Sequence, residues 1–459
     1  MNIKNKFTLI TMVAALPLGG CGIYTNYHRP ETLPLDSLYR DTPASLEDTS
    51  SLGDLSWREL FTDSLLTKWI ETGLEKNCDL QTARLRTEEA QASLQASRLS
   101  LLPSVSLTPQ GSVSGFGGGK TSKTYSLGGA AEWEIDAFGS LRNARKGSQA
   151  ALEASRAYEQ AVQTRLVATI AETYYSLLAL DRELEITRET EQELAENVRV
   201  MNALKHAGER NEAAVAQAEA SRLDAEASVL SLKRQIHELE NSFSTLLGIV
   251  PEGIERGCLE SLSFPEDLSV GVPVQLLGRR PDVRQAEWEL AQAFYATNEA
   301  RSAFYPKITL SGSAGWTNNS GAGIVNPGDW LASAVGSLTQ PLFNRGRNIA
   351  NLKTAEAQME QARIAFVQKL LDAGAEVNNA LTQWQTARQS IALDSQKVET
   401  LEKAVRSTQM LMKDGTANYL EVLTARQTLL QARLAEVSDK YEEIQGVISL
   451  YHSLGGGTR

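Results

Sequence analysis

Few residues of this chain stand in patterns that could carry out catalysis. The four histidines are isolated from one another in the sequence, at His28, His206, His237 and His452. The triglycine before Lys120 resembles a phosphate-binding loop, but it lies in a predicted hairpin turn with no helix after it. CxxC, HExxH and nucleophile-elbow motifs do not occur. We therefore expect no enzymatic activity, no metal and no cofactor.

Cys21 stands in a more informative pattern. It follows an apolar run, residues 7–18, that two lysines precede. A run of about 12 residues has the length of a signal-peptide core and is short for a membrane span. The cysteine and the small residues before it are similar to a bacterial lipobox, in which the peptidase cuts before the cysteine and its sulfur receives diacylglycerol. We expect residues 1–20 to be removed and several acyl chains on Cys21 to anchor the protein. An ordinary signal peptide is the alternative.

Three carboxylates recur at every second position of one segment. Glu132, Glu134 and Asp136 alternate with Trp133 and Ile135. A period of two predicts a β-strand with one polar and one apolar face, as in strands of membrane barrels. We expect the carboxylates to face an aqueous lumen, where a ring of like charge would favour cations. The alternation alone also fits a soluble β-sandwich or a pair of capping hairpins.

The strand that holds these carboxylates belongs to one of two predicted hairpins, at about 103–137 and 306–342. Apolar and polar residues alternate in both, and Gly-rich polar stretches separate the strands of each. The fourth strand, at about 330–342, alternates poorly, so we place it mainly by its position in a repeat.

The chain contains two tandem copies of one pattern. Leu102-Pro103 recurs as Tyr305-Pro306, and Leu247-Gly248 recurs as Leu454-Gly455, at a nearly constant offset of roughly 205 residues. Each copy predicts a helix, a hairpin, a long helix, a Gly-marked turn and a return helix. The predicted segments are a signal peptide at 1–20, an extended stretch at 21–54, repeat 1 at 55–250, a linker at 251–279 and repeat 2 at 280–459.

Long helices must position the hairpins. Proline is missing from 110–250 and from 342–459, and both spans are rich in good helix formers. Residues 141–206 would make one helix of roughly 100 Å. In the return helix at 418–453, apolar residues step by threes and fours, which indicates a coiled-coil seam. An ordinary amphipathic helix in a bundle is the alternative.

Composition limits the function further. The 459 residues carry 45 Lys and Arg against 56 Asp and Glu, a net charge of -11, whereas nucleic-acid-binding proteins normally present a basic face. No run of 18 apolar residues occurs beyond the N-terminus, so we expect no ordinary spanning helix. Three cysteines are too few for a disulfide scaffold, and Cys78 and Cys258 could pair or stay free.

Four strands per chain cannot close a barrel, and an open strand edge cannot lie in lipid because its backbone groups would lack partners. A membrane role therefore requires an oligomer. A dimer would give eight strands and a lumen largely filled by side chains. A trimer would give twelve strands and a wider pore, and the same symmetry would arrange the long helices as a hollow cylinder.

Short stretches over nearly the whole mature chain carry a family resemblance. They are Trp57-Arg58-Glu59-Leu60-Phe61, Asn77-Cys78-Asp79-Leu80, Trp133-Glu134-Ile135-Asp136, Arg280-Pro281-Asp282-Val283, Phe304-Tyr305-Pro306, Pro341-Leu342-Phe343 and Leu454-Gly455-Gly456-Gly457. Together they resemble the outer-membrane efflux protein family of TolC-like channels, and within it the lipoprotein branch that serves resistance-nodulation-division pumps.

The resemblance implies an α+β membrane protein: a trimer whose 12-stranded β-barrel, four strands per chain, continues into a long α-helical barrel built from the two repeats. It implies an outer-membrane location in a Gram-negative bacterium. The implied partners are two further copies, a periplasmic adaptor protein, an inner-membrane pump and outer-membrane lipid, with no nucleic acid.

The resemblance also places periplasmic tips at two turns, at Gly208 and at Lys413-Asp414-Gly415, where the adaptor would be met and the aperture closed. The glycines could instead serve only the tight turn between helices. Both functions are compatible.

Three residues after the second turn are aperture candidates by the same resemblance. Leu420 resembles a family position that narrows the aperture, and Thr424 replaces an Asp that some family members carry. Glu421 or Asp414 could supply a ring of three carboxylates instead, although a solvated surface position is equally compatible with either.

The leading hypothesis is a passive exit duct of a tripartite efflux pump for drugs or other small molecules. The alternatives are the exit duct of type I protein secretion and a lipid-anchored periplasmic coiled-coil scaffold. Heat-modifiable trimers and bilayer conductance would separate the duct from the scaffold.

Overall fold

The computed structural model describes residues 24–31, 33, 38, 51–115, 117, 121–259, 276–317, 329–414, 416 and 418–457. The predicted signal peptide, the predicted lipid-attachment site Cys21 and Gly415 lie outside these residues, as do most of the extended stretch and the middle of the linker. The chain folds as two compact units, each of which combines segments from both repeats.

The elements follow the predicted order. They are η1 (Leu52–Asp54), α2 (Trp57–Leu60), α3 (Ser64–Lys76), α4 (Cys78–Leu99), β1 (Ser104–Ser114), β2 (Ser122–Ile135), α5 (Ser140–His206), α6 (Glu212–Leu247), α7 (Leu276–Arg279), α8 (Pro281–Ser302), β3 (Lys307–Thr317), β4 (Asp329–Thr339), α9 (Arg347–Lys413) and α10 (Tyr419–Ser453). The predicted long helices and hairpins are confirmed. Instead of one first helix, the chain has α3 and α4, and Asn77 lies between them.

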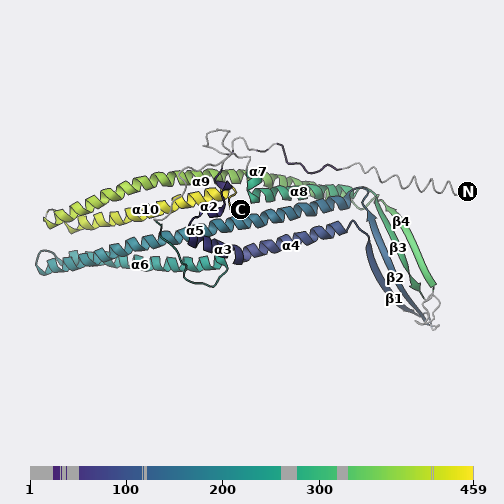
Figure 1. The fold of residues 1–459 in the computed structure, drawn as a ribbon, viewed down its shortest axis with the longest axis horizontal. Helices are drawn as coiled ribbons and strands as arrows, with labels where there is room; N and C mark the ends of the chain where they lie inside the picture. The colour runs from purple at the N-terminus through teal and green to yellow at the C-terminus, as the bar shows by residue number, and fades with distance from the viewer. Residues whose placement is uncertain are drawn as a thin grey trace. The chain divides into compact units, whose positions relative to one another are not determined.

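The first unit holds the described parts of residues 1–33, 85–157 and 285–368. Its four strands form one antiparallel sheet in the order β1-β2-β3-β4 (Figure 1). Its helical parts pack in series. Ser97 of α4 lies 2.7 Å from Ser148 of α5, the Lys146 ammonium of α5 stands over the Tyr295 ring of α8, and Thr297 of α8 donates to a carbonyl of α9.

The register of the sheet gathers apolar residues on one face across all four strands. Val105 is paired with Ala131, Trp133 with Leu310, and Ile308 with Leu338. Large apolar side chains on this face are 40–82% exposed at Val105, Leu107, Val113, Leu127, Trp133, Leu310, Trp316 and Leu338. A soluble sandwich would cover such a face. Its exposure in the single chain fits a surface that meets lipid.

The opposite face of the sheet is lined by hydroxyl groups. Ser104, Glu132 and Ser311 share one row, and the Ser313 and Ser333 hydroxyls lie 2.8 Å apart in another. The main exception with a described side chain is Val335, 57% exposed on this polar face, which explains why the fourth strand alternates poorly in the sequence.

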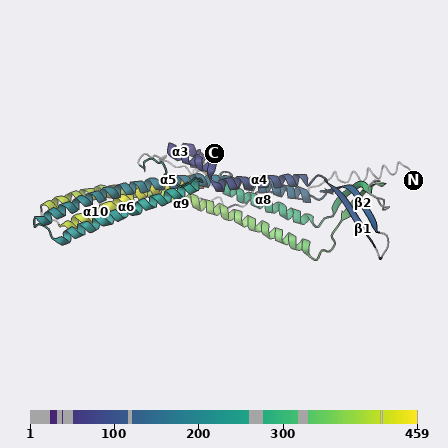
Figure 2. The same ribbon diagram turned by 90° about the horizontal axis from the view of Figure 1, so that it is seen from below.

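The second unit holds the described parts of residues 34–84, 158–284 and 369–459. Within it α6 lies beside α5, and α10 beside α9, as both views show (Figure 1, Figure 2). The centre of the unit is aromatic and fully buried, with Phe61 packed edge-on against Tyr451, and Tyr174 against Tyr175. Gly248 ends α6 in the left-handed region, at φ +73°, where a Cβ would collide with the Lys76 carbonyl.

No helix in the described part of the chain is both long and apolar enough to cross a membrane.

Candidate functional site

Two sets of predicted site residues lie in different units, and each is described within its own. The first set is the acidic residues of β2. Glu132 is exposed on the polar face of the sheet and has no ion pair among the described residues. Glu134 lies on the same face, but its carboxylate is 3.4 Å from the Lys307 ammonium of β3. One of these two charges is therefore partly neutralised within the chain.

Asp136 corrects the prediction of three lumen carboxylates. β2 ends at Ile135, and the Asp136 side chain turns toward the start of α5, where it is only 9% exposed. It accepts hydrogen bonds from the backbone N–H groups of Leu141 and Arg142 at 3.0 and 2.9 Å, and from Arg142 Nε at 3.0 Å. Because a carboxylate stabilises the first turn of a helix, Asp136 acts as a structural cap.

The second set is the turns of the second unit. Gly208 has φ +80° with open space where a Cβ would be, and it lies two residues after α5 ends at His206. The other turn begins where α9 ends, at Lys413. Asp414 is exposed there, and the Thr416 N–H donates to the Leu411 carbonyl at 2.9 Å. Each turn lies between one long helix and its return helix, as predicted.

The three aperture candidates share an exposed side of α10. Leu420 is 52% exposed, and Glu421 and Thr424 are also exposed. The neighbouring residues Val422 and Leu423 are buried, so the helix separates a packed side from a solvent-facing side. The structure thus leaves the candidates accessible for a contact outside the chain.

Sequence reasoning missed two contacts that tie α10 to α5 beside these candidates. The Asn197 amide donates to the Tyr419 hydroxyl at 2.9 Å, and the Arg426 guanidinium lies 3.4 Å from the Glu193 carboxylate. Burial raises the pKa of Tyr419. The pairs are separated by more than 200 residues, and no local pattern indicates them. Tyr419 also belongs to an apolar cluster with Leu194, Met201, Val215, Ala218, Ala225 and Leu423.

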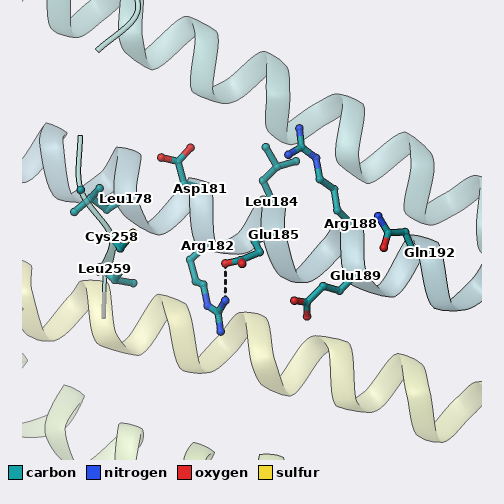
Figure 3. Close-up of a pocket in the computed structure, with 11 residues that line it drawn as sticks. Leu178, Asp181, Arg182, Leu184, Glu185, Arg188, Glu189, Gln192, Cys258 and Leu259 are labelled. Carbon is teal, nitrogen blue, oxygen red and sulfur yellow. Dashed lines mark hydrogen bonds and ion pairs between the residues drawn. The ribbon is translucent and has the colours of Figure 1, made fainter. Parts of the chain in front are cut away.

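A groove of about 480 Å³ runs along α5 in the same unit (Figure 3). Arg182 and Glu185 form an ion pair at 2.6 Å on its wall. Beside it, Arg256 is bound to Asp181 and Glu240, which fixes the segment that leads to Cys258. Charged side chains make up much of the lining of this groove, and Asp181, Arg182 and Glu185 among them are in ion pairs.

A buried ionic cluster lies elsewhere in the second unit, where the start of repeat 2 meets the end of the chain. Arg280 is 2% exposed and contacts the carboxylates of Asp282 and Glu376 at 2.6 and 2.7 Å and the Ser453 carbonyl at 3.1 Å. Burial by itself would raise the pKa of Asp282, but the hydrogen bonds and charges of Arg280 and Lys369 hold it well below its ordinary value. Burial and then the Arg280 charge lower the pKa of His452.

Neither Cys78 nor Cys258 forms a disulfide in the structure, and both are exposed. Among the described residues, no group of three or more His, Cys, Asp or Glu side chains is arranged to hold a metal ion. The geometry therefore consists of a two-faced sheet, long helices and exposed turns, which suits a wall or a docking end.

The chain matches a family model described as "Outer membrane efflux protein" over residues 69–249 and 272–456. These two segments correspond closely to the two repeats found in the sequence.

Curated relatives match over almost their whole lengths. The cation efflux system protein CusC of Escherichia coli (strain K12) is 27% identical over 457 residues, which cover 98% of this chain and 99% of CusC. The solvent efflux pump outer membrane protein SrpC of Pseudomonas putida is 28% identical over 467 residues, covering 98% of each chain.

Solved structures agree with the fold. The outer-membrane channel OprN superposes with a TM-score of 0.86 at 26% identity, covering 95% of this chain and 100% of OprN. The open state of the MtrE outer membrane channel of Neisseria gonorrhoeae gives a TM-score of 0.85 at 27% identity, covering 96% of this chain and 99% of MtrE.

Proposed function

The chain belongs to the outer membrane efflux protein family, and from this premise we propose that it is the outer-membrane exit duct of a tripartite efflux pump. It is an outer-membrane protein that extends into the periplasm. CusC is named for cation efflux and SrpC for solvent efflux, so what these relatives share is the duct and not one cargo.

The observation that carries the proposal is the sheet. It has one apolar face across four strands, a hydroxyl-lined opposite face and two open edges, β1 and β4. In lipid, unpaired backbone groups at these edges would each cost several kcal/mol (~4). Further copies that pair β1 of one chain with β4 of the next would remove the edges, and three copies would give twelve strands.

The exposed apolar residues of the helices support the same head-to-tail association. In both units α9 is the last helix of the series, and α4 or α6 is the first. Exposed large apolar residues lie on these first and last helices: Leu85 and Leu99 on α4, Leu223 and Leu230 on α6, and Ile349, Ile364, Leu371 and Leu393 on α9. The helices between them, α5, α8 and α10, contribute only Val200 and Leu420 among the described residues. A heterologous contact of this kind closes into a ring when its rotation allows.

We also propose that transport through the duct is passive and that the chain is not an enzyme and needs no cofactor beyond the lipid on Cys21. A periplasmic adaptor protein would meet the turns at Gly208 and Lys413-Asp414-Gly415, and an inner-membrane pump would supply the energy. The exposed aperture candidates Leu420 and Glu421 agree with a contact at this end.

The test is to purify the full-length protein from outer membranes in detergent, determine its mass without denaturation, and record its conductance in planar bilayers. We expect a trimer that dissociates on heating and that forms discrete conducting channels. A stable monomer without conductance would contradict the duct and would favour the scaffold.

A further inference from the structure

The junction between β4 and α9 differs from the equivalent junction between β2 and α5. We call residues 340–347 the second corner. Leu342 is 94% and Phe343 86% exposed, the highest values among the large apolar side chains of the described residues. Two arginines follow them, Arg345 and Arg347, and both are exposed with no ion pair among the described residues. Two exposed apolar side chains next to two unneutralised cations make a surface that is complementary to a partner both apolar and anionic.

The equivalent junction in the first repeat shows what is missing. There Phe138 is stacked on Tyr305 at 5.2 Å, and Arg142 is neutralised by Asp136. Phe343 and Arg347 occupy the same places in the second repeat, but Pro341 stands where the repeat would have the counterpart of Asp136. The second corner has therefore kept the aromatic ring and the cation and lacks the anion.

Arg345 adds a conformational argument. Its φ is +57°, and it is the only non-glycine residue at positive φ among the residues that the structure describes. An L-residue other than Gly or Asn is strained in this region by roughly 1–2 kcal/mol. The next residue, Gly346, also has a positive φ, of +77°. Of the two adjacent positions at positive φ, only the second is occupied by glycine. A guanidinium kept at a strained position, and exposed, points to a function for its charge.

We propose that the second corner binds the phosphate headgroups of outer-membrane phospholipid, with Leu342 and Phe343 inserted among the acyl chains and Arg345 and Arg347 on the phosphates. The corner continues the apolar face of the sheet. Leu338, four residues before Leu342, lies on that face and is 68% exposed. Interfacial anchors pair apolar and aromatic residues with arginine in this way. The inference rests on the proposed function, because it needs the sheet to lie in a membrane.

A second copy of the chain is a weaker candidate for this partner. In the head-to-tail association, the second corner would face the α4 end of the next copy. That end presents Leu99 and Leu102, which are apolar, but the charged residue nearest to them in the sequence is Arg98, which is exposed. A third cation would repel Arg345 and Arg347, whereas a phosphate would neutralise them.

The first experiment locates Phe343. In the full-length protein with Cys78→Ser and Cys258→Ser, Phe343→Cys is labelled with a nitrobenzoxadiazole dye and reconstituted into vesicles of phosphatidylethanolamine and phosphatidylglycerol. We expect nitroxides on the lipid acyl chains to quench this dye several-fold more strongly than a dye at Asp414→Cys, the aqueous control. Shielding of the 343 dye in lipid-free detergent trimers, from iodide and nitroxide alike, would show that a neighbouring copy covers the corner and would overturn the inference.

The second experiment separates charge from folding. Arg345→Gly relieves the positive φ while it removes the cation, so we expect an unchanged or higher unfolding temperature together with weaker lipid retention. Native mass spectrometry would count phosphatidylglycerol on the trimer. Each arginine removed, in Arg345→Gly or Arg347→Gln, should weaken retention by roughly fivefold. Arg363→Gln, which removes a paired arginine of the same helix, is the matched control and should change nothing.

Two further outcomes are decisive. Inorganic phosphate alone should not displace the lipid, because the acyl contacts contribute to binding, and full displacement would show a free-anion site instead. Conductance of the same samples separates failure of the duct hypothesis from failure of lipid binding at the second corner. A wild type that never inserts contradicts the duct, whereas a conducting trimer whose 343 dye is not quenched by lipid contradicts only this inference.

Discussion

At the scale of single residues, the cluster around Arg280 shows how the end of the chain is held. Arg280 begins repeat 2, yet it binds the Ser453 carbonyl at the last turn of α10. The phenol of Tyr451 donates to the Leu55 carbonyl and accepts from the Gly457 N–H. Buried polar groups with every partner satisfied specify one arrangement. The Arg280 cluster therefore fastens the start of repeat 2 to its last turn, and the Tyr451 hydrogen bond to Leu55 links that turn to repeat 1 inside the second unit.

Arg280→Met should destabilise the protein strongly, because it leaves the partly buried Asp282 carboxylate, 24% exposed, without its closest cation. Removing one partner of a buried ion pair typically costs about 3–5 kcal/mol. Thermal unfolding of the detergent-solubilised protein, followed by circular dichroism, measures this effect. Arg363→Gln on the surface of α9 is the control, and its midpoint should equal that of the wild type.

His452 predicts a pH dependence with a defined sign. Its pKa is lowered in the folded state by burial and by Arg280, although Glu376 and Asp282 raise it and Arg165 lowers it further. The unfolded chain therefore binds the proton more readily, so the free energy of unfolding should fall as the pH drops below about 6.5. His452→Gln should make the unfolding midpoint depend less on pH between about pH 5 and 7. An equally steep slope in the variant would assign the effect to another group.

The acidic residues of the sheet predict the ion preference of the barrel. Glu132 has no partner among the described residues, whereas Glu134 is paired with Lys307. Glu132→Gln should therefore reduce cation preference, and Lys307→Gln should increase it by releasing Glu134. Reversal potentials in planar bilayers at low salt measure both, since screening is weaker there. Shifts in the same direction for the two variants would place these residues away from the ion path.

At the scale of elements, the sequence predicted what local patterns encode. The 67 residues of α5 and of α9 follow from proline-free, helix-forming spans, and the strands follow from alternation. The break at Asn77 was missed because α3 and α4 are each good helices. Its side chain accepts from the Leu80 N–H and donates to the Leu246 carbonyl, a contact 169 residues away.

Asp136 shows the limit of a period-two pattern. It continues the alternation of Glu132 and Glu134, but the strand ends one residue before it, and the helix that follows uses its carboxylate as a cap. Strand ends depend on where hydrogen-bond partners stop, which the pattern of one segment does not contain. Tyr419 and Asn197 were missed for the related reason that their contact forms only after two distant helices pack.

The contacts between α10 and α5 predict how easily the exposed turn of α9 and α10 moves. Tyr419→Phe removes the hydrogen bond with Asn197, and Arg426→Gln removes the ion pair with Glu193. Each should cost roughly 1 kcal/mol, so the double variant should raise the open population about tenfold or more if the two contacts hold the turn closed. Single-channel recordings measure open time. An unchanged open time in a folded trimer would show that these contacts hold the packing alone.

At the scale of the whole molecule, the single chain leaves strand edges unpaired and apolar helix surfaces exposed. Within it the sheet has two open edges, and large apolar side chains are exposed mainly on the first and last helices of each unit. Hydrophobic burial on association is then concentrated on α4, α6 and α9, whereas the helices between them already have neighbours on both sides. This distribution predicts that substitutions on α9 act on assembly more than on the fold of one chain.

Ile364→Asp tests that distinction. Ile364 is 56% exposed in the single chain, so a carboxylate there meets water before assembly and should leave the secondary structure unchanged. In the assembled ring the same carboxylate would be buried against the next copy without a partner, at a cost of several kcal/mol (~3) per interface, and three interfaces multiply the penalty. We expect heat-modifiable trimers to disappear and monomers with native helicity to accumulate. Arg363→Gln, one position away, should assemble as the wild type does. Stable trimers of Ile364→Asp would show that α9 faces solvent in the assembly, and the order of helices around the duct would then have to be different.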